Sequence, residues 1–120
     1  MVVNRRYTAR GKNLPSSPKK VRPIADNIRG RSYVEAVAIL YSMPNKGAKL
    51  LGKVVKSAAS NAMYHNKNLS EDMIIVKVIM IDDGKRRKSV WPRARGRADR
   101  LVNRSCHIFV EVDEKMGSGE

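Results

Sequence analysis

The chain has 120 residues, a length typical of a single domain, and a formal net charge of +14 at pH 7. Apolar residues make up 42% of the sequence but aromatic residues only 5%, so we expect one modest core built from aliphatic side chains. A single cysteine excludes an internal disulfide, and no apolar run reaches the length of about 18 residues that a membrane-spanning helix needs. Residues 1–10 lack the apolar segment of a secretory signal, so we expect an intracellular protein that binds a polyanion.

The positive charge is concentrated in two segments of the chain. Residues 1–31 contain nine Lys or Arg against one acidic residue, and residues 85–104 contain the same numbers. Residues 32–84 are nearly neutral and hold most of the apolar side chains, whereas residues 105–120 are acidic. Cations that only keep a surface soluble are normally mixed with acids. The pattern therefore predicts a compact body with two separate regions that contact a polyanion, for which nucleic acid is the default.

The first predicted helix begins at Pro18 and ends near Gly30. Ser17 can cap it, Pro18 suits a first position that needs no N–H, and glycine is a common C-terminal stop. Pro23 inside the helix removes one backbone hydrogen bond and is expected to bend or loosen it. One face of this helix carries the apolar residues Val21, Ile24, Ala25 and Ile28.

Two further helices are predicted, at residues 33–41 and 46–64. Ser32 and Glu35 form a capping box at the start of the earlier one. The later helix has an apolar stripe on one side and lysines on the other, which is typical of a helix that packs on a core. Its residues 58–62 (AASNA) are small and allow another backbone to approach closely.

Strands are predicted at residues 73–81 and 106–112, and residues 2–12 form either a strand or an extended arm. Residues 1–112 are expected to make one globular domain, and residues 113–120 a disordered tail. In the strand at 73–81, the residues expected to share one face are Ile74, Val76, Val78 and Met80. In the strand at 106–112, the corresponding residues are Cys106, Ile108, Val110 and Val112.

The segment between these two strands is too polar to fold on a core of its own. Residues 85–88 (KRRK) are four successive cations, and in residues 93–98 (RARGRA) arginine alternates with small residues. That alternation would place three guanidinium groups on one side of an extended chain. We therefore expect a basic hairpin at about residues 82–104, which reaches roughly 25 Å beyond the body and becomes ordered against RNA phosphates.

Candidate RNA contacts are the cations of the two basic segments. Guanidinium forks match phosphate oxygens, and cations in the first turns of a helix oppose its dipole unless an anion binds nearby. Trp91, in the most charged segment, either stacks on a base or anchors the hairpin. The predicted RNA-binding residues are Arg5, Arg6, Arg10, Lys12, Lys19, Lys20, Arg22, Lys85, Arg86, Arg93, Arg95, Arg97 and Arg100.

No arrangement typical of an enzyme or a metal site is readable. His65 and His107 lie far apart in the chain without companion ligands, and Cys106 falls on an apolar strand face as a small core residue. We expect no catalysis, no cofactor and no metal. A small nuclease or RNA-modifying enzyme is the competing enzymatic interpretation, and its activity would depend on one of these three residues.

Two classes of binding protein also need consideration. A free-standing DNA- or RNA-binding regulator would need an element that reads bases, and none is evident. Binding to a membrane surface would need an amphipathic basic helix with bulky apolar anchors, which the sequence lacks, so no membrane partner is expected.

Four motifs carry a resemblance to a known family. They are residues 17–22 (SPKKVR), 28–30 (IRG), 58–62 (AASNA) and, most specifically, 92–100 (PRARGRADR). Together they resemble the large-subunit ribosomal protein L-twenty-two family in its bacterial form, over residues 8–112. Three features depart from the family pattern, namely Pro23 in a helix usually free of proline, the more basic run at residues 85–88, and Trp91 in place of a smaller apolar residue.

The resemblance implies an α+β fold in which three helices pack on a small antiparallel sheet, with a long protruding basic β-hairpin. It implies a structural constituent of the large ribosomal subunit, in the cytoplasm, which binds ribosomal RNA and joins several RNA domains during assembly. It further implies that the hairpin tip lines the nascent-peptide exit tunnel beside ribosomal protein L-four, near nascent peptides and macrolides. The tip carried over from the family consists of Arg87, Lys88, Ser89, Val90 and Trp91.

Overall fold

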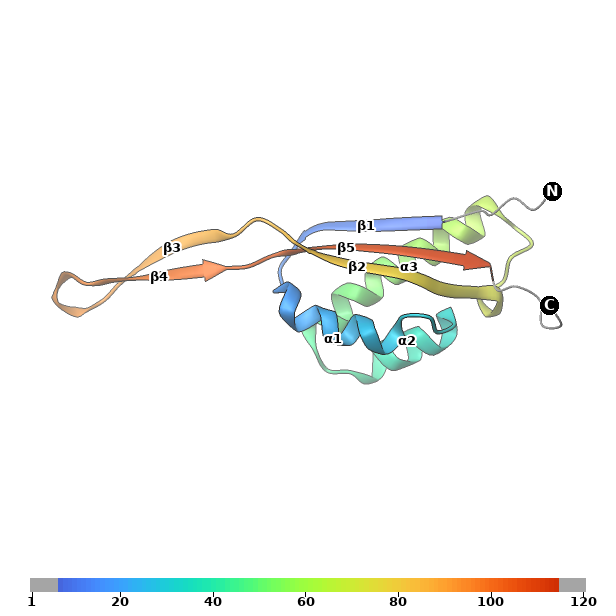
Figure 1. The fold of residues 1–120 in the computed structure, drawn as a ribbon, viewed down its shortest axis with the longest axis horizontal. Coiled ribbons are helices and arrows are strands. Elements are labelled where there is room, and N and C mark those ends of the chain that lie inside the picture. The colour runs from blue at the N-terminus through green and yellow to red at the C-terminus, as the bar shows by residue number, and fades with distance from the viewer. Residues whose placement is uncertain (1–6, 115–120) are drawn as a thin grey trace.

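The computed structural model in Figure 1 describes residues 7–114 of the chain, which form a body and a projecting hairpin. The molecule measures 70 Å along its longest axis and 27 and 20 Å along the other two, because the hairpin extends from one end of the body. In chain order the elements are β1 (Tyr7–Leu14), α1 (Pro18–Ile28), α2 (Tyr33–Ser42), α3 (Lys46–His65), a 3-10 turn (Glu71–Met73), β2 (Ile74–Asp83), β3 (Arg87–Pro92), a second 3-10 turn (Ala94–Gly96), β4 (Ala98–Asn103) and β5 (Cys106–Glu114).

The body is a three-stranded antiparallel sheet with three helices, which confirms the α+β prediction. The strand order is β1-β5-β2, so that β5 lies in the centre and pairs on both sides. Helix α3 packs on β1 and β5, and α1 and α2 pack on β2. The N-terminal segment, for which the sequence allows a strand or an arm, is therefore a strand as far as the described residues reach.

The core lies between the helices and one face of the sheet. Strand β5 contributes Cys106, Ile108, Val110 and Val112, all fully buried, as their alternation predicts. Helix α3 lies close to the sheet at Gly11 of β1. A Cβ atom added to this glycine would lie only 3.1 Å from a methyl group of Val54. The residues that α3 buries are mostly small, namely Gly47, Ala48, Leu51, Val54, Val55, Ala58, Ala59 and Ala62.

Strand β2 departs from its predicted alternation. Val78 and Met80 were expected on the buried face, but Met80 is 47% exposed and Ile79 and Ile81 are buried instead. The pairing of β2 with β5 shifts register between Val76 and Val78, which marks a β-bulge. The extra residue reverses which side chains face the core, so the prediction is wrong beyond the bulge.

The helices lie where the caps and the apolar periodicity place them. Helix α1 continues through Pro23, which is exposed, so that water can satisfy the carbonyl left free by the missing N–H. At the start of α2, the Ser32 hydroxyl accepts a hydrogen bond of 3.3 Å from the backbone N–H of Glu35. This contact confirms the Ser32 half of the predicted capping box and satisfies one of the free N–H groups of the first turn, whereas the Glu35 carboxylate pairs with Arg31 instead.

The last strand is longer than expected at its C-terminal end. Asp113 and Glu114, which were expected in a disordered tail, belong to β5 and pair with Ile75 and Ile74. The Glu114 carboxylate also accepts a 2.8 Å hydrogen bond from the side chain of Asn66. The rest of the predicted tail, residues 115–120, lies outside the described part of the chain.

Replacing Ile108 with alanine is expected to lower the free energy of unfolding by about 2–5 kcal/mol, because the central strand then leaves a cavity in the core. Val90→Ala on the hairpin, where Val90 is 67% exposed, should change it by about 0.5 kcal/mol or less. Chemical denaturation followed by circular dichroism measures both values. Equal effects of the two substitutions would contradict the assignment of the core.

Candidate nucleic-acid interface

The hairpin joins the body through a narrow neck, where the chain leaves β2 and returns to β5. The backbone N–H of Gly84 donates to the carbonyl of Ser105 at 2.9 Å, and the Ser105 hydroxyl donates to the carbonyl of Lys85 at 2.6 Å. A Cβ atom on Gly84 would overlap the Ser105 hydroxyl oxygen and lie 3.1 Å from the Ser105 carbonyl carbon, so any larger residue there would force the neck to shift. These contacts set the direction in which the hairpin leaves the body.

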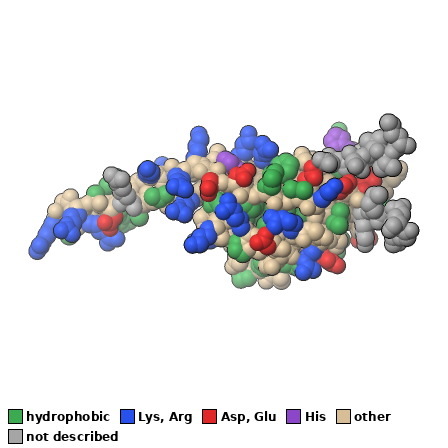
Figure 2. Space-filling model, in the orientation of Figure 1, with side chains coloured by type: hydrophobic (Ala, Val, Ile, Leu, Met, Phe, Trp, Pro, Cys, Tyr) green, Lys and Arg blue, Asp and Glu red, His purple; other side chains and the backbone are tan. Residues whose placement is uncertain are grey.

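A broad groove lies beside the neck and brings together segments that are distant in the sequence. Its volume is about 1100 Å³, and it is bounded by the hairpin base, the end of β1 and the first turns of α1 and α3. None of the described residues that line it is acidic. Figure 2 shows Lys and Arg side chains gathered along the hairpin and at the adjoining end of the body. The cations that line the groove are Lys19, Lys20, Lys46, Lys85, Arg86, Arg87 and Arg104.

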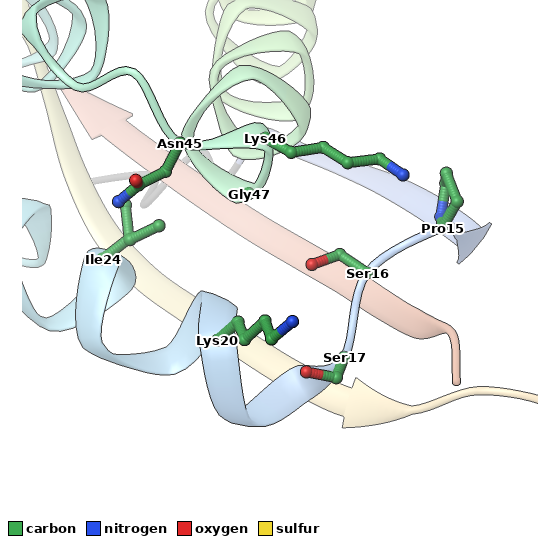
Figure 3. Close-up of a pocket in the computed structure, with 8 residues that line it drawn as sticks. All are labelled: Pro15, Ser16, Ser17, Lys20, Ile24, Asn45, Lys46 and Gly47. Atoms are coloured by element: carbon green, nitrogen blue, oxygen red, sulfur yellow. The ribbon is translucent and has the colours of Figure 1, made fainter. Parts of the chain in front are cut away.

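A smaller cavity of about 360 Å³ lies at the body side of this groove, between the first turns of α1 and α3. Figure 3 shows the side chains of Lys20 and Lys46 extending along it toward the segment that contains Ser16 and Ser17. Neither helix has an acidic residue in its first turn, and neither N-cap side chain makes a capping hydrogen bond. The free N–H groups and the two ammonium groups make this cavity electropositive, as a phosphate group requires.

Three of the predicted cations on the body lie away from the groove. Arg22 donates a 3.1 Å hydrogen bond to the carbonyl of Ile81 and thereby ties α1 to β2. Arg10 lies on β1, where its guanidinium carbon is 5.3 Å from the centre of the Phe109 ring. Lys12 is exposed on the same strand. Arg10 and Lys12 thus offer contacts separate from the groove, whereas the Arg22 guanidinium already has a structural partner.

Three more of the predicted cations are described incompletely or not at all. Arg5 and Arg6 lie outside the described residues. Arg100 belongs by its backbone to β4, and its side chain also lies outside the described part.

The end of the hairpin is not where the family resemblance places it. The predicted tip, Arg87, Lys88, Ser89, Val90 and Trp91, forms most of strand β3 and pairs with β4. The last pair of the ladder is Pro92 with Ala98, so the chain reverses over residues 93–97. The placement of the tip is therefore wrong, and Arg87 lies at the hairpin base, where it lines the groove.

The arginines of the reversal do not alternate along an extended chain, contrary to the prediction from their spacing. Arg95 and Gly96 have φ angles of 62° and 72°, and this left-handed pair turns the backbone. The N–H of Arg93 donates to the carbonyl of Arg97 at 2.6 Å, and the Arg93 side chain forms an ion pair with Asp99. The turn is thus closed by its own contacts, and its three arginines are exposed.

The two arms of the hairpin have no core of their own. Val90 and Trp91 on β3 are 67% and 56% exposed, and Leu101 and Val102 on β4 are 41% and 45% exposed. An isolated two-stranded hairpin is marginally stable in water. Exposed apolar side chains among cations indicate a surface that a partner covers. Trp91, for which the sequence allows stacking or anchoring, packs into no apolar core and is free to stack.

Two groove residues were missed by the sequence reasoning. Arg104 lies inside the second basic segment and could have been chosen from charge alone. Lys46 lies in the nearly neutral middle of the chain, and only the packing of α3 against α1 brings it beside Lys20. Helical periodicity places a residue on a face of its own helix but does not give the position of one helix relative to another.

The residues that an enzyme would need have structural partners instead. His65 stacks on Tyr7 with ring centroids 6.2 Å apart, and His107 accepts a 3.0 Å hydrogen bond from the N–H of Asn13. Cys106 is buried, and burial raises the pKa of its thiol. Within residues 7–114 no group of three or more His, Cys, Asp or Glu could hold a metal ion. No helix in the same range has the length and apolar content to cross a membrane.

Comparison with known proteins agrees with the residues and the fold. The model of the family described as Ribosomal protein L22p/L17e matches residues 9–113. The large ribosomal subunit protein uL22 of Borrelia hermsii is 87% identical over 120 residues, which cover both chains completely. The protein of the same name from Borreliella burgdorferi is 85% identical over 115 residues, or 96% of each chain. The chain belongs to the ribosomal protein L22p/L17e family, in its bacterial form, and is therefore not an enzyme.

The buried thiol gives a direct test of the interpretation of Cys106 as a core residue. At pH 8 a disulfide reagent should label the native protein at least roughly tenfold more slowly than the chain unfolded in guanidinium, because burial blocks access and the raised pKa lowers the thiolate fraction. Absorbance of the released thiol measures the rate. Equally fast labelling of native protein would show an accessible, reactive cysteine.

Proposed function

We propose that the chain is a structural constituent of the large ribosomal subunit, which binds ribosomal RNA and joins several RNA domains during assembly in the cytoplasm. Its family and the names of its relatives support the place in the large subunit. The observation that carries RNA binding is the groove at the neck, where seven cations from three separate segments line one surface without an acid. Such a surface is suited to a phosphate backbone.

RNA binding would then combine charge neutralisation with shape. Each Lys or Arg that contacts a phosphate releases condensed counterions, so affinity falls steeply as salt rises. An RNA segment seated in the groove touches the first turns of α1 and α3 and the base of the hairpin at the same time. The neck contacts of Gly84 and Ser105 hold the hairpin base in a fixed position relative to α1 and α3. RNA segments bound to the body and to the hairpin are thereby held at a set distance.

The hairpin is proposed to extend among RNA segments as far as the nascent-peptide exit tunnel. Its projection from the body, its exposed cations and its exposed Trp91 support this part of the proposal. The end that faces the tunnel would be the turn at residues 93–97. The resemblance adds ribosomal protein L-four as a neighbour, and nascent peptides and macrolides as molecules that pass this end.

The double variant K20Q/R86Q is expected to weaken binding to large-subunit ribosomal RNA. Both side chains line the groove, so the slope of log K against log salt should fall by about 1.4, or about 0.7 for each lost phosphate contact. The matched control K67Q/K77Q removes the same charge from two lysines that do not line the groove. Filter binding at several salt concentrations measures the slopes.

The control should keep nearly the wild-type slope. Equal losses in both double variants would mean that the protein binds RNA through net charge alone. A flat salt response of the wild-type protein would contradict RNA binding by charge neutralisation.

Removing the hairpin should remove one set of RNA contacts and leave the body folded. Gly84 and Ser105 are already hydrogen-bonded neighbours, so residues 85–104 can be replaced by Asn-Gly, which favours a two-residue hairpin turn. Chemical footprinting on large-subunit ribosomal RNA should show several distant protected segments with the intact protein. The shortened protein should lose a subset of them.

The lost subset identifies the RNA that the hairpin contacts, and circular dichroism checks that the body remains folded. If the shortened protein keeps every protection, the hairpin does not contact RNA. If the intact protein gives no discrete protection, the proposed function fails.

A further inference from the structure

The outer face of α3 carries a row of lysines, of which only Lys46 also lines the groove at the neck. Lys46, Lys49, Lys53 and Lys56 follow one another at spacings of three or four residues, so they share one face of the helix. All four are exposed, and the residues that α3 buries lie on the opposite side. The helix contains no Asp or Glu. We call this set the α3 lysine row.

This arrangement is unfavourable for the isolated helix. Like charges three or four residues apart repel each other by about 0.2–0.5 kcal/mol for each pair. Lys46 and Lys49 also lie in the first turn, where a positive charge opposes the helix dipole. Within the described residues none of the four lysines forms an ion pair. Folding therefore gives no reason for the row, whereas a bound polyanion would.

An exposed aromatic ring extends the same face. Tyr64 follows Lys56 by eight residues on the same side of the helix and is 79% exposed. Its ring meets that of His65 edge to face, with centroids 5.4 Å apart and planes at 83°. From Lys46 to Tyr64 the face is about 27 Å long, at 1.5 Å per residue.

We propose that the α3 lysine row together with Tyr64 is a second RNA-binding surface, which holds the backbone of an RNA segment and stacks one unpaired base on the tyrosine. Cations that follow a backbone beside an aromatic ring are the usual elements of single-strand recognition. The inference rests on the proposed function, because it takes the RNA of the large subunit as its ligand. Lys46 lines the groove as well, so the two surfaces are continuous.

The composition of this face favours RNA over an acidic protein. Protein interfaces need an apolar centre that partner side chains can cover. Between Lys46 and Tyr64, the exposed residues of α3 besides the lysines are Ser57, Ser60 and Asn61, and none of them is aliphatic. A surface of cations and hydroxyl groups with one aromatic ring matches phosphates, sugars and a base.

The test uses the full-length triple variant K49Q/K53Q/K56Q, which leaves the shared Lys46 in place. Loss of three phosphate contacts should lower the salt slope by about 2 and the affinity for large-subunit ribosomal RNA roughly 50-fold at 0.15 M salt. Footprinting should show one RNA segment losing protection, different from the segment that K20Q/R86Q loses. Thermal unfolding serves as the folding control, and the midpoint should stay or rise because like-charge repulsion is removed.

Tyr64 is tested separately. Tyr64→Ala should weaken binding roughly fivefold or more through the lost stacking, whereas Tyr64→Phe keeps the ring and should bind like the wild type. Equal losses in both variants would point to the hydroxyl group and overturn the stacking role.

Three results would overturn the inference. If the wild type binds RNA and the triple variant shows the same slope and protections, the lysine row is not an RNA site, and the proposed function stands. If the wild type protects no segment, the inference and the proposed function fail together. If the triple variant keeps every RNA protection but loses cross-links to a neighbouring protein in assembled subunits, the row binds protein instead.

Discussion

The structure depends on one strand, β5, which uses both of its hydrogen-bonding edges. It pairs with β1 and β2, buries every second side chain from Cys106 to Val112, and is thereby the most constrained element of the body. The hairpin is a continuation of the β2–β5 pair past the neck at Gly84 and Ser105. The direction of the hairpin is therefore set by the buried sheet and the neck contacts rather than by contacts within its arms. A small aliphatic core can in this way orient an arm that has no core.

The unpaired positive charge lies in other parts of the molecule than the aliphatic core. The described residues contain four ion pairs, all between partly exposed side chains, which stabilise little and cannot balance a net charge of +14. Burial of apolar side chains in the body provides the free energy of folding. The cations lie on the surface, outside this core. The unbalanced charge is left at the neck, along the hairpin and on the outer side of α3. A polyanion that contacts these surfaces reduces the repulsion between their cations. The same contacts that bind the polyanion therefore also stabilise the folded protein.

Local signals in the sequence were sufficient for the helices, whereas the α+β arrangement was expected from the family resemblance. The Ser32 cap, Pro18 and the apolar periodicity act within one or two turns and need no knowledge of the rest of the chain. The bulge in β2 depends on the register against β5, which is not readable from either strand alone. The turn at residues 93–97 depends on Arg95 in a left-handed conformation, which few residues other than glycine adopt. Lys46 reaches the groove only through helix packing. The candidate site was therefore predicted for Lys19 and Lys20 of α1 and for Lys85 and Arg86 of the hairpin base, but not for Arg104 or Lys46.

The two parts of the hairpin differ in how much order they have before binding. Its end is closed by the backbone contact between Arg93 and Arg97 and by the ion pair of Arg93 with Asp99. Its arms are held by a ladder of backbone bonds with exposed side chains, so their order is marginal without a partner. Immobilising a flexible segment on binding consumes part of the interaction free energy. Because the turn and the neck are already ordered, this loss is confined to the arms between them, where the proposed RNA would contact Trp91 and the cations.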